Sequence, residues 1–366
     1  MKKHRIVVGM SGGVDSSVSA WLLKEAGHDV IGLFMKNWEE TDAQGVCQSS
    51  REYEDVVAVC NQIGIPYYSV NFVKEYRELV FNQFLADCKA GLTPNPDVLC
   101  NREIKFKAFF NKAMEFGADY LATGHYCRAQ TDQPAKPLLL KGSDPNKDQS
   151  YFLYAINKEA LSRTLFPVGH LLKSEVRALA RQAKLATSDK KDSTGICFIG
   201  ERNFKQFLSQ FLGFQKGPLL TLDGKQVGEH DGFAYYTIGQ RKGIGLGGEG
   251  EAWFVVGKDP NQNIVFVERG ENHPALYCTE LIADQLTWIN DPPPLPFRCS
   301  AKIRYRQQDV ECEVMSHETG CLRVVFLKPQ RAVTPGQSVV FYDQEITLGG
   351  GIIRLLHQIV ERTADP

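Results

Sequence analysis

A segment rich in glycine and serine near the start of the chain has residue types suited to phosphate chemistry. It reads VVGMSGGVDSSVSA over residues 7–20, so an apolar run is followed by glycines and then by a helix-like pattern. In a strand–loop–helix unit, backbone amides and the positive end of the helix dipole converge on an anion such as phosphate. The glycines stand at positions 9, 12 and 13 and no lysine follows them, so the spacing excludes a Walker loop and a dinucleotide loop. Chemistry at a γ-phosphate is therefore disfavoured.

The string SGGVDS at residues 11–16 resembles instead the loop of ATP pyrophosphatases, which cleave ATP between its α- and β-phosphates and transfer AMP. Ser16 and Ser17 are predicted to cap the following helix. Asp15 would repel a bare triphosphate, so we expect it to hold Mg²⁺ bound with ATP, or the helix terminus. A glycine turn without a ligand is the alternative. The expected ATP contacts in this segment are Gly9, Met10, Ser11, Gly12, Gly13, Val14, Asp15 and Ser16.

Two cysteines lie in segments rich in proline, glycine, serine and basic residues. They are Cys100, in TPNPDVLCNREIKF, and Cys197, in KKDSTGICFIGERNF. Basic neighbours favour the thiolate, the form that attacks electrophiles or carries a sulfane sulfur. Other cysteines are expected to be small buried hydrophobic residues, as is usual for this residue type. These are Cys60, Cys88, Cys299 and Cys312.

Composition restricts the class of protein. The chain has 366 residues, 43% of them hydrophobic, and a net charge of −1, which predicts two or three globular domains and no whole-protein field that would attract nucleic acid. The ten cysteines are at least nine residues apart, so neither a structural zinc site nor an iron–sulfur cluster is expected. No apolar run is long enough for a signal peptide or a membrane span, which predicts a cytoplasmic protein without a membrane partner.

The sequence pattern that predicts secondary structure changes along the chain. Strand-like and helix-like segments alternate from residue 5 to about residue 125, which predicts a Rossmann-like α/β domain with a parallel sheet. Glycine turns and hairpins follow, and from about residue 275 strand-like pieces such as KIRYRQ predict a small β-barrel, with Lys302, Arg304 and Arg306 on one face of a strand. The predicted domains are a catalytic domain at 1–205, a mixed connecting domain at 206–272 and a C-terminal β-barrel domain at 273–360.

Several strings occur in an order that resembles the family of bacterial tRNA-specific 2-thiouridylases over essentially the whole chain. They are SGGVDS at 11–16, FMKNW at 34–38, TPNPDVLCN at 93–101, ATGHY at 122–126, NKDQSYFLY at 146–154, DSTGICFIGERNF at 192–204, GQRKGIGLGG at 239–248 and TPGQSVVFY at 334–342. Several of these strings are too long and unusual to recur by chance. The resemblance implies an ATP-dependent sulfurtransferase that adenylates the C2 oxygen of the wobble uridine and then inserts sulfur.

The resemblance also implies roles for individual residues. Cys197 would carry the persulfide sulfur, and Cys100 would free or deliver that sulfur, with a transient disulfide between the two. The persulfide would come from a sulfur-relay protein or a cysteine desulfurase. Met35 and Gly124 would complete the ATP site. The target base would meet Asn95, Pro96 and Asp97. The tRNA would meet His125, Lys147, Asp148, Gln149, Arg304, Tyr305 and Gln337.

From the residues alone, two other classes of function stay open. A different ATP pyrophosphatase, of the amidotransferase-synthetase or argininosuccinate synthase type, would need no persulfide and would tolerate loss of Cys197. A non-catalytic module that senses nucleotide or binds RNA would tolerate loss of both cysteines and form no pyrophosphate. Without the resemblance, His125 is a histidine at a strand end, and the basic residues of 302–307 are a solvated barrel face.

Overall fold

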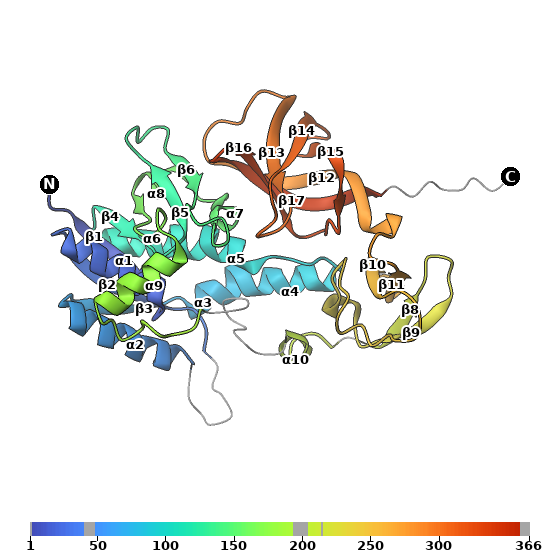
Figure 1. Cartoon of the computed structure of the whole chain (residues 1–366), viewed down its shortest axis with the longest axis horizontal. Helices are drawn as coiled ribbons and strands as arrows, with labels where there is room; N and C mark the ends of the chain where they lie inside the picture. The colour runs from blue at the N-terminus through green and yellow to red at the C-terminus, as the bar shows by residue number, and fades with distance from the viewer. Residues whose placement is uncertain (1, 40–47, 193–203, 214, 359–366) are drawn as a thin grey trace.

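The computed structural model describes residues 2–39, 48–192, 204–213 and 215–358, and its N-terminal part is built on a five-stranded parallel sheet (Figure 1). The strand order is β3-β2-β1-β4-β7, so the chain reverses its direction of growth between β1 and β4. This order is that of a doubly wound α/β sheet, as the alternating sequence pattern predicted. The strands are β1 (Arg5–Met10), β2 (Asp29–Lys36), β3 (Tyr67–Asn71), β4 (Tyr120–Ala122) and β7 (Thr164–Leu165).

Helices cover both faces of this sheet. Ile6 and Val8 of β1 pack in one apolar cluster with Val56 of α2, whereas Val7 packs in another with Phe109 and Phe110. Successive side chains of a strand point to opposite faces, so the unbroken apolar run IVVGM at residues 6–10 is explained by burial on both. The helices of this part are α1 (Val14–Glu25), α2 (Gln48–Ile63), α3 (Val73–Tyr76), α4 (Asn82–Lys89), α5 (Pro96–Leu99), α6 (Phe110–Glu115), α7 (Ser150–Leu153), α8 (Lys158–Ser162) and α9 (Lys173–Gln182), with π-helical stretches at Arg77–Phe81 and Cys100–Phe109.

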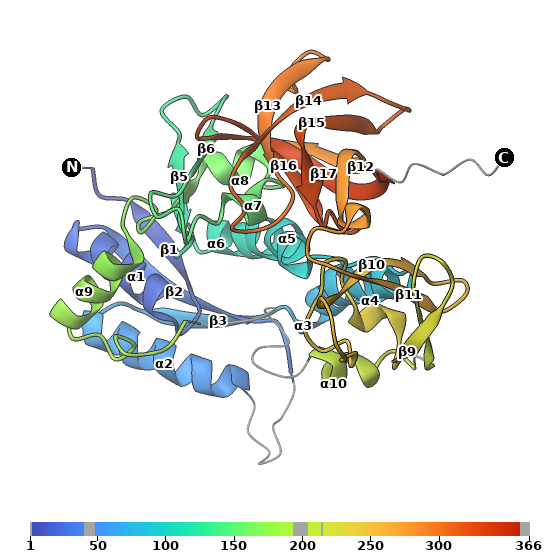
Figure 2. The same cartoon turned by 45° about the vertical axis from the view of Figure 1, so that its right-hand side comes forward.

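A four-stranded sheet follows, in the order β10-β11-β8-β9. The predicted hairpin is present, because β10 and β11 are antiparallel and are joined at residues 260–263. The sheet buries Leu219, Val255 and Val265 against Phe81 and Phe84, and α4 points toward this sheet in both views (Figures 1 and 2). Its elements are α10 (Phe204–Ser209), β8 (Gly217–Leu220), β9 (Gln226–His230), a 3-10 turn (Phe233–Tyr235), β10 (Trp253–Asp259) and β11 (Ile264–Arg269).

The C-terminal part is a closed barrel of six antiparallel strands. The order β12-β15-β14-β13-β16-β17 closes through pairing of β12 with β17, which leaves these strands without open edges. Leu281, Val324 and Phe341 lie in its apolar interior. The strands are β12 (Tyr277–Trp288), β13 (Phe297–Lys302), β14 (Val310–Ser316), β15 (Leu322–Arg331), β16 (Ser338–Asp343) and β17 (Ile346–Gln358), preceded by a 3-10 turn (Pro274–Leu276).

The barrel is joined to the first part by strands and by a buried ion pair. A hairpin of β5 (Cys127–Gln130) and β6 (Leu138–Lys141), which follows β4 in the chain, extends the barrel sheet by pairing with β17. Lys302 at the end of β13 donates to Asp148 at 3.0 Å, and the two side chains are only 10% and 3% exposed. Elements far apart in sequence are therefore held together by both backbone pairing and charge.

The predicted fold class is confirmed: an α/β domain with a parallel sheet, a smaller mixed part and a β-barrel. One local prediction is wrong. Residues 302–307 do not form a strand with three basic side chains on one face, because β13 ends at Lys302 and that side chain is buried against Asp148. The domain limits at 205/206 and 272/273 stay predictions. Among the described residues, no helix has the length and apolar character needed to cross a membrane.

The Asp148–Lys302 pair gives a test of how the parts are held together. Lys302→Met should lower the free energy of unfolding by roughly 3–5 kcal/mol, because it leaves the buried carboxylate of Asp148 without its cation. Asp148→Asn combined with Lys302→Met should restore part of the loss, since no buried charge then remains. Urea unfolding of the single variants Lys302→Met and Asp148→Asn and of the double variant measures this, with the exposed Lys225→Met as control. An additive double variant would contradict the assigned pair.

Candidate nucleotide and base site

The predicted phosphate loop lies at the carboxyl ends of the central strands. Gly9 and Met10 end β1, residues 11–13 form the turn, and α1 begins at Val14. β1 pairs with β2 on one side and β4 on the other, so Met35 near the end of β2 and Gly124 after β4 flank the loop. This is the point at which the strand order reverses, where doubly wound sheets bind their ligands. The tertiary structure thus brings the predicted ATP residues together.

The prediction that Ser16 and Ser17 cap α1 is wrong. Gly13 is the N-cap residue of α1, and Ser16 and Ser17 donate to its carbonyl oxygen at 3.1 and 2.8 Å. Serine side chains in these positions therefore turn back on the loop instead of accepting from the helix amides. The first amides of a helix have no intrahelical acceptor, which makes this twelve-residue helix suitable for an anion.

Gly124 contacts the loop directly. A Cβ atom at this position would lie 2.7 Å from the amide nitrogen of Ser16 and 2.8 Å from the carbonyl carbon of Asp15. A side chain here would displace the start of α1. The glycine in ATGHY is therefore required by close packing of the β4 end against the loop, whatever further contact it makes with nucleotide.

Asp15 is held by a lysine and a tyrosine. Lys173 donates to its two carboxylate oxygens at 2.7 and 2.8 Å, and the hydroxyl of Tyr126 donates to Oδ1 at 2.7 Å. Burial, together with the negative charge of Asp15, raises the pKa of Tyr126, which keeps this phenol protonated as a donor. The predicted Asp15 thus lies beside a cation that no loop motif indicated.

A second carboxylate, Asp192, forms ion pairs with three basic side chains near the loop. Lys147, Lys173 and Arg177 lie 2.7, 2.9 and 2.7 Å from its oxygens. Burial alone would raise the pKa of Asp192, but hydrogen bonds from Lys147 and Lys173 outweigh it and hold this pKa well below the usual range. The stabilisation of the network is therefore complete above the ordinary carboxyl pKa and is lost only as the pH falls through the lowered one.

Lys190 adds a further cation on the other side of the loop. Its ammonium donates to the carbonyl of Gly12 at 2.9 Å and to Asp55 at 2.5 Å. The sequence pattern assigns no role at the loop to Lys190 or to Lys173. The one signal available was the concentration of basic residues over 173–191, which reads equally well as a solvated helix face.

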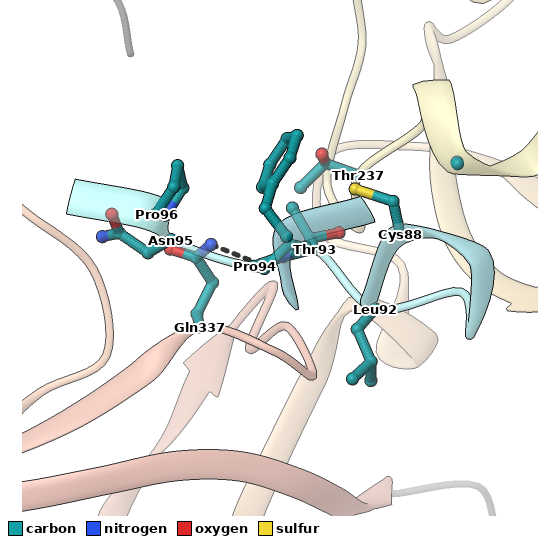
Figure 3. Close-up of a pocket in the computed structure, with 10 residues that line it drawn as sticks. Cys88, Leu92, Thr93, Pro94, Asn95, Pro96, Thr237 and Gln337 are labelled. Atoms are coloured by element: carbon teal, nitrogen blue, oxygen red, sulfur yellow. Dashed lines mark hydrogen bonds between the residues drawn. The ribbon is translucent and has the colours of Figure 1, made fainter. Parts of the chain in front are cut away.

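The predicted base-contacting residues begin a short helix beside a pocket (Figure 3). Asn95 is the N-cap of α5, and its Oδ1 accepts from the amide of Asp97 at 3.1 Å. Asn95 and Pro96 line a cavity of about 250 Å³ together with Gln337 from the barrel part. The remaining lining residues are Phe84, Cys88, Leu92, Thr93, Pro94, Ala234 and Thr237. All three parts of the structure therefore contribute to one small pocket.

Only one of the two predicted catalytic cysteines, Cys100, lies among the described residues. Cys197 lies outside the described residues. Cys100 directly follows α5 and is only 1% exposed, in an apolar cluster with Phe84 and Ile104. This differs from the prediction of a basic loop, because the proline-led α5 continues into a helical stretch that buries the thiol. Of its basic neighbours, Arg102 pairs with Glu103 at 2.8 Å. Of the other cysteines, Cys60, Cys88 and Cys312 are buried as predicted, and Cys299 is half-buried.

His125 lies near the same region. Its Nδ1 is 2.8 Å from the hydroxyl of Thr123, and its Nε2 is 3.5 Å from the ammonium of Lys105. Burial, with a contribution from the charge of Lys105, holds the pKa of His125 well below its usual value, so the ring is neutral at physiological pH. A neutral ring would recognise RNA by hydrogen bonding or stacking and not by charge.

The other residues predicted to meet tRNA make contacts within the protein. Lys147 pairs with Asp192, and Asp148 with Lys302. The Oε1 of Gln149 accepts from the amide of Tyr126 at 2.9 Å, and the Nε2 of Gln337 donates to the carbonyl of Thr93 at 2.6 Å.

Arg304 and Tyr305 are likewise in contact with other parts. Arg304 donates to the carbonyl of Ile238 and to the hydroxyl of Thr334, both at 3.0 Å, and burial lowers its pKa. The ring of Tyr305 lies 4.5 Å from that of Phe152, centroid to centroid. These residues therefore connect the parts of the protein, and their contact with tRNA stays a prediction.

Comparison with known proteins gives matches along nearly the whole chain. Residues 4–201, 205–269 and 278–353 match family models described as tRNA methyl transferase HUP domain, tRNA methyl transferase PRC-barrel domain and aminomethyltransferase beta-barrel domain. A protein of Protochlamydia amoebophila named tRNA-specific 2-thiouridylase MnmA is 62% identical over 97% of this chain and 94% of its own. A protein of Geobacillus kaustophilus named tRNA-specific 2-thiouridylase MnmA 2 is 59% identical over 95% of this chain and 94% of its own. A protein of Halalkalibacterium halodurans named tRNA-specific 2-thiouridylase MnmA is 58% identical over 96% of this chain and 95% of its own.

Lys173 offers a test of the site that is independent of any acceptor for AMP. Lys173→Gln should raise the dissociation constant for MgATP about tenfold or more, because a charged hydrogen-bond donor beside the loop is lost. Isothermal titration with a non-hydrolysable ATP analogue measures this. Arg181→Gln, at the exposed end of the same helix, is the matched control. Equal affinities of the Lys173 variant and the control would remove Lys173 from the nucleotide site.

Proposed function

Because this chain belongs to the tRNA-specific 2-thiouridylase family, we propose that it converts the wobble uridine of tRNA to 2-thiouridine, using ATP to activate the base and a cysteine persulfide as the source of sulfur. The observation that carries the proposal is the placement of the pyrophosphatase-type loop at the carboxyl ends of β1 and β4, beside Lys173 and Lys190. An anion site lined with lysines suits a triphosphate whose β- and γ-phosphates leave together as pyrophosphate.

Activation of the base is the first chemical step. The uracil C2 oxygen attacks the α-phosphorus of ATP, and the bond to the β-phosphate oxygen breaks, so pyrophosphate leaves and AMP is joined to C2. This converts a poor leaving group into a good one. Lys173 and Lys190 would neutralise charge that develops on the departing pyrophosphate, and the amides at the start of α1 would hold it.

The carboxylates at the loop suit Mg²⁺ only in company with nucleotide. In the described part of the chain, no group of three or more His, Cys, Asp or Glu side chains could hold a metal ion by itself. Magnesium is usually held by one or two carboxylates and the substrate phosphates, so Asp15 would hold it, with Lys173 moving from Asp15 to a phosphate. Bound there, Mg²⁺ would neutralise phosphate charge.

Sulfur transfer completes the reaction. A sulfur-relay protein or cysteine desulfurase loads Cys197 with a persulfide. Cys100 then attacks the inner sulfur of this persulfide, which forms a Cys100–Cys197 disulfide and releases sulfide to displace AMP from C2. An external thiol reductant returns the disulfide to two thiols. Asp192, five residues before Cys197, lies at the nucleotide loop, and Phe207, ten residues after it, shares the apolar cluster of Cys100. The described segment before Cys197 thus leads from the nucleotide loop, and the described segment after it leads to the apolar cluster that contains Cys100.

The base itself would be held at α5. Asn95, Pro96 and Asp97 would meet the uracil edge after the nucleotide is turned out of the anticodon loop, which costs a few kcal/mol of stacking. The cavity of about 250 Å³ beside Asn95 and Pro96 is small, as expected for a single ring. Its enclosure by three parts of the protein would exclude water from the activated base.

Reaction of the purified protein with MgATP, a persulfide source and unmodified tRNA should yield pyrophosphate and 2-thiouridine. Cys197→Ser and Cys100→Ser should each abolish 2-thiouridine, because a hydroxyl neither carries a persulfide nor attacks one, while ATP binding is retained. Cys321→Ser, in a barrel turn, is the control. Thiouridine from the Cys197 variant would overturn the persulfide assignment. Pyrophosphate formed only with another acceptor would overturn the tRNA assignment.

Binding of tRNA should weaken steeply with salt, because contacts to phosphate release counterions. Arg304→Ala should lower affinity for tRNA and leave affinity for ATP unchanged. Filter binding over a range of salt concentrations measures both. Since Arg304 also donates to Ile238, a thermal melt of the variant separates lost affinity from lost folding. Binding of tRNA that does not respond to salt would contradict the electrostatic assignment.

A further inference from the structure

Residues 91–93, which lead into the predicted base-contacting residues, are closely packed on two sides. Gly91 lies against the turn after β10, where a Cβ atom would come within 2.2 Å of Cγ of Pro260. On the other side, a Cβ atom on Gly336 of the barrel part would lie 2.8 Å from the amide nitrogen of Thr93. Both glycines have φ in the left-handed region, +79° and +91°. Residues 91–93 therefore lie in close contact with both other parts of the protein.

Thr93 is the residue at which these contacts meet. Its amide donates to the carbonyl of Pro335 at 2.9 Å, and its carbonyl accepts from Gln337 at 2.6 Å. Its hydroxyl accepts from the ammonium of Lys258, on β10, at 3.3 Å. The polar groups of one residue are thus satisfied from the middle sheet and the barrel.

The ammonium group of Lys258 is partly buried. Burial lowers its pKa to about 8, and burial raises the pKa of the neighbouring Cys88 to about 12. At neutral pH Cys88 is consequently an uncharged thiol, while Lys258 is mostly protonated. A charge removed from water needs an acceptor, and Thr93 provides one.

The segment after Thr93 is stiff. Thr93 precedes Pro94, and Asn95 precedes Pro96, so each is confined to extended backbone, while each proline has a fixed φ. α5 then starts at Pro96 and leads directly to Cys100. A displacement at Thr93 would therefore be transmitted to Asn95 and Asp97 instead of being absorbed in a flexible loop.

We propose that Lys258 is a positioning residue for the target base, which acts through Thr93 to fix the segment 93–97 against the middle sheet and the barrel. In this arrangement the two C-terminal parts set the geometry of the base pocket as well as enlarging the surface of the protein. The inference rests on the proposed function for the identity of the base. The hydrogen bond and the close packing exist independently of it.

The experiment compares Thr93→Val, which removes the hydroxyl at nearly constant shape, with Thr93→Ser, which retains it, and adds Lys258→Met and the double variant. Thr93→Val and Lys258→Met should each lower kcat for 2-thiouridine formation by about tenfold, with KM for ATP and tRNA changed less than about twofold, because the contact aligns the base and does not bind substrate. Thr93→Ser and the exposed Lys225→Met should resemble the wild type.

Two further readouts separate this inference from others. The double variant should be no slower than either single variant, since residues that act through one contact are not additive. Hydrogen exchange of the amides at 97–100 in the protein without tRNA should be faster in Thr93→Val and Lys258→Met only. Multiplicative losses, or unchanged kcat and exchange, would overturn the positioning role. If the wild type makes no 2-thiouridine, the proposed function fails, and the exchange measurement still decides whether Lys258 fixes the segment.

Discussion

The position of the nucleotide loop depends on one constraint, the reversal of strand order between β1 and β4. The chain leaves β1 through α1 on one face of the sheet, whereas after β4 it passes through the β5–β6 hairpin before α8 on the opposite face, so the carboxyl ends of β1 and β4 are left open to a ligand. Gly124 then packs against the peptide bond between Asp15 and Ser16, which ties the end of β4 to the start of α1. Residues far apart in the sequence thus form one candidate anion site, at the carboxyl ends of β1 and β4.

Charge balance at this loop explains how an aspartate is accommodated in a phosphate site. Asp15 and Asp192 share the ammonium of Lys173, and Lys147 and Arg177 add further positive charge at Asp192. A loop that binds pyrophosphate needs cations when the ligand is present, and these carboxylates stabilise the same cations when it is absent. The ion pairs therefore keep the site folded while leaving donors that can be transferred to phosphate.

Contacts between the parts of the protein involve several of the residues expected to meet tRNA. Asp148, Arg304 and Gln337 each bond to an element outside their own sequence neighbourhood, and Gln337 does so at Thr93, which lines the same cavity as Asn95 and Pro96. Under the proposed function, a tRNA docked on the barrel and the middle sheet would be coupled structurally to the loop that would hold the base. The residues predicted to meet tRNA are therefore also residues that pack the parts of the protein together.

The sequence by itself determined the fold class, the phosphate loop and the family, because these follow from local periodicity, glycine spacing and long motifs. Partners distant in sequence were decided only by tertiary structure: Lys173 for Asp15, Lys258 for Thr93, and Asp148 for Lys302, the residue at which β13 ends. Burial of Cys100 likewise could not be predicted from the sequence, since polar neighbours along the chain do not reveal which face of a helix packs inward. A motif records the residue types that chemistry needs, whereas charge pairing and burial depend on which segments meet in space.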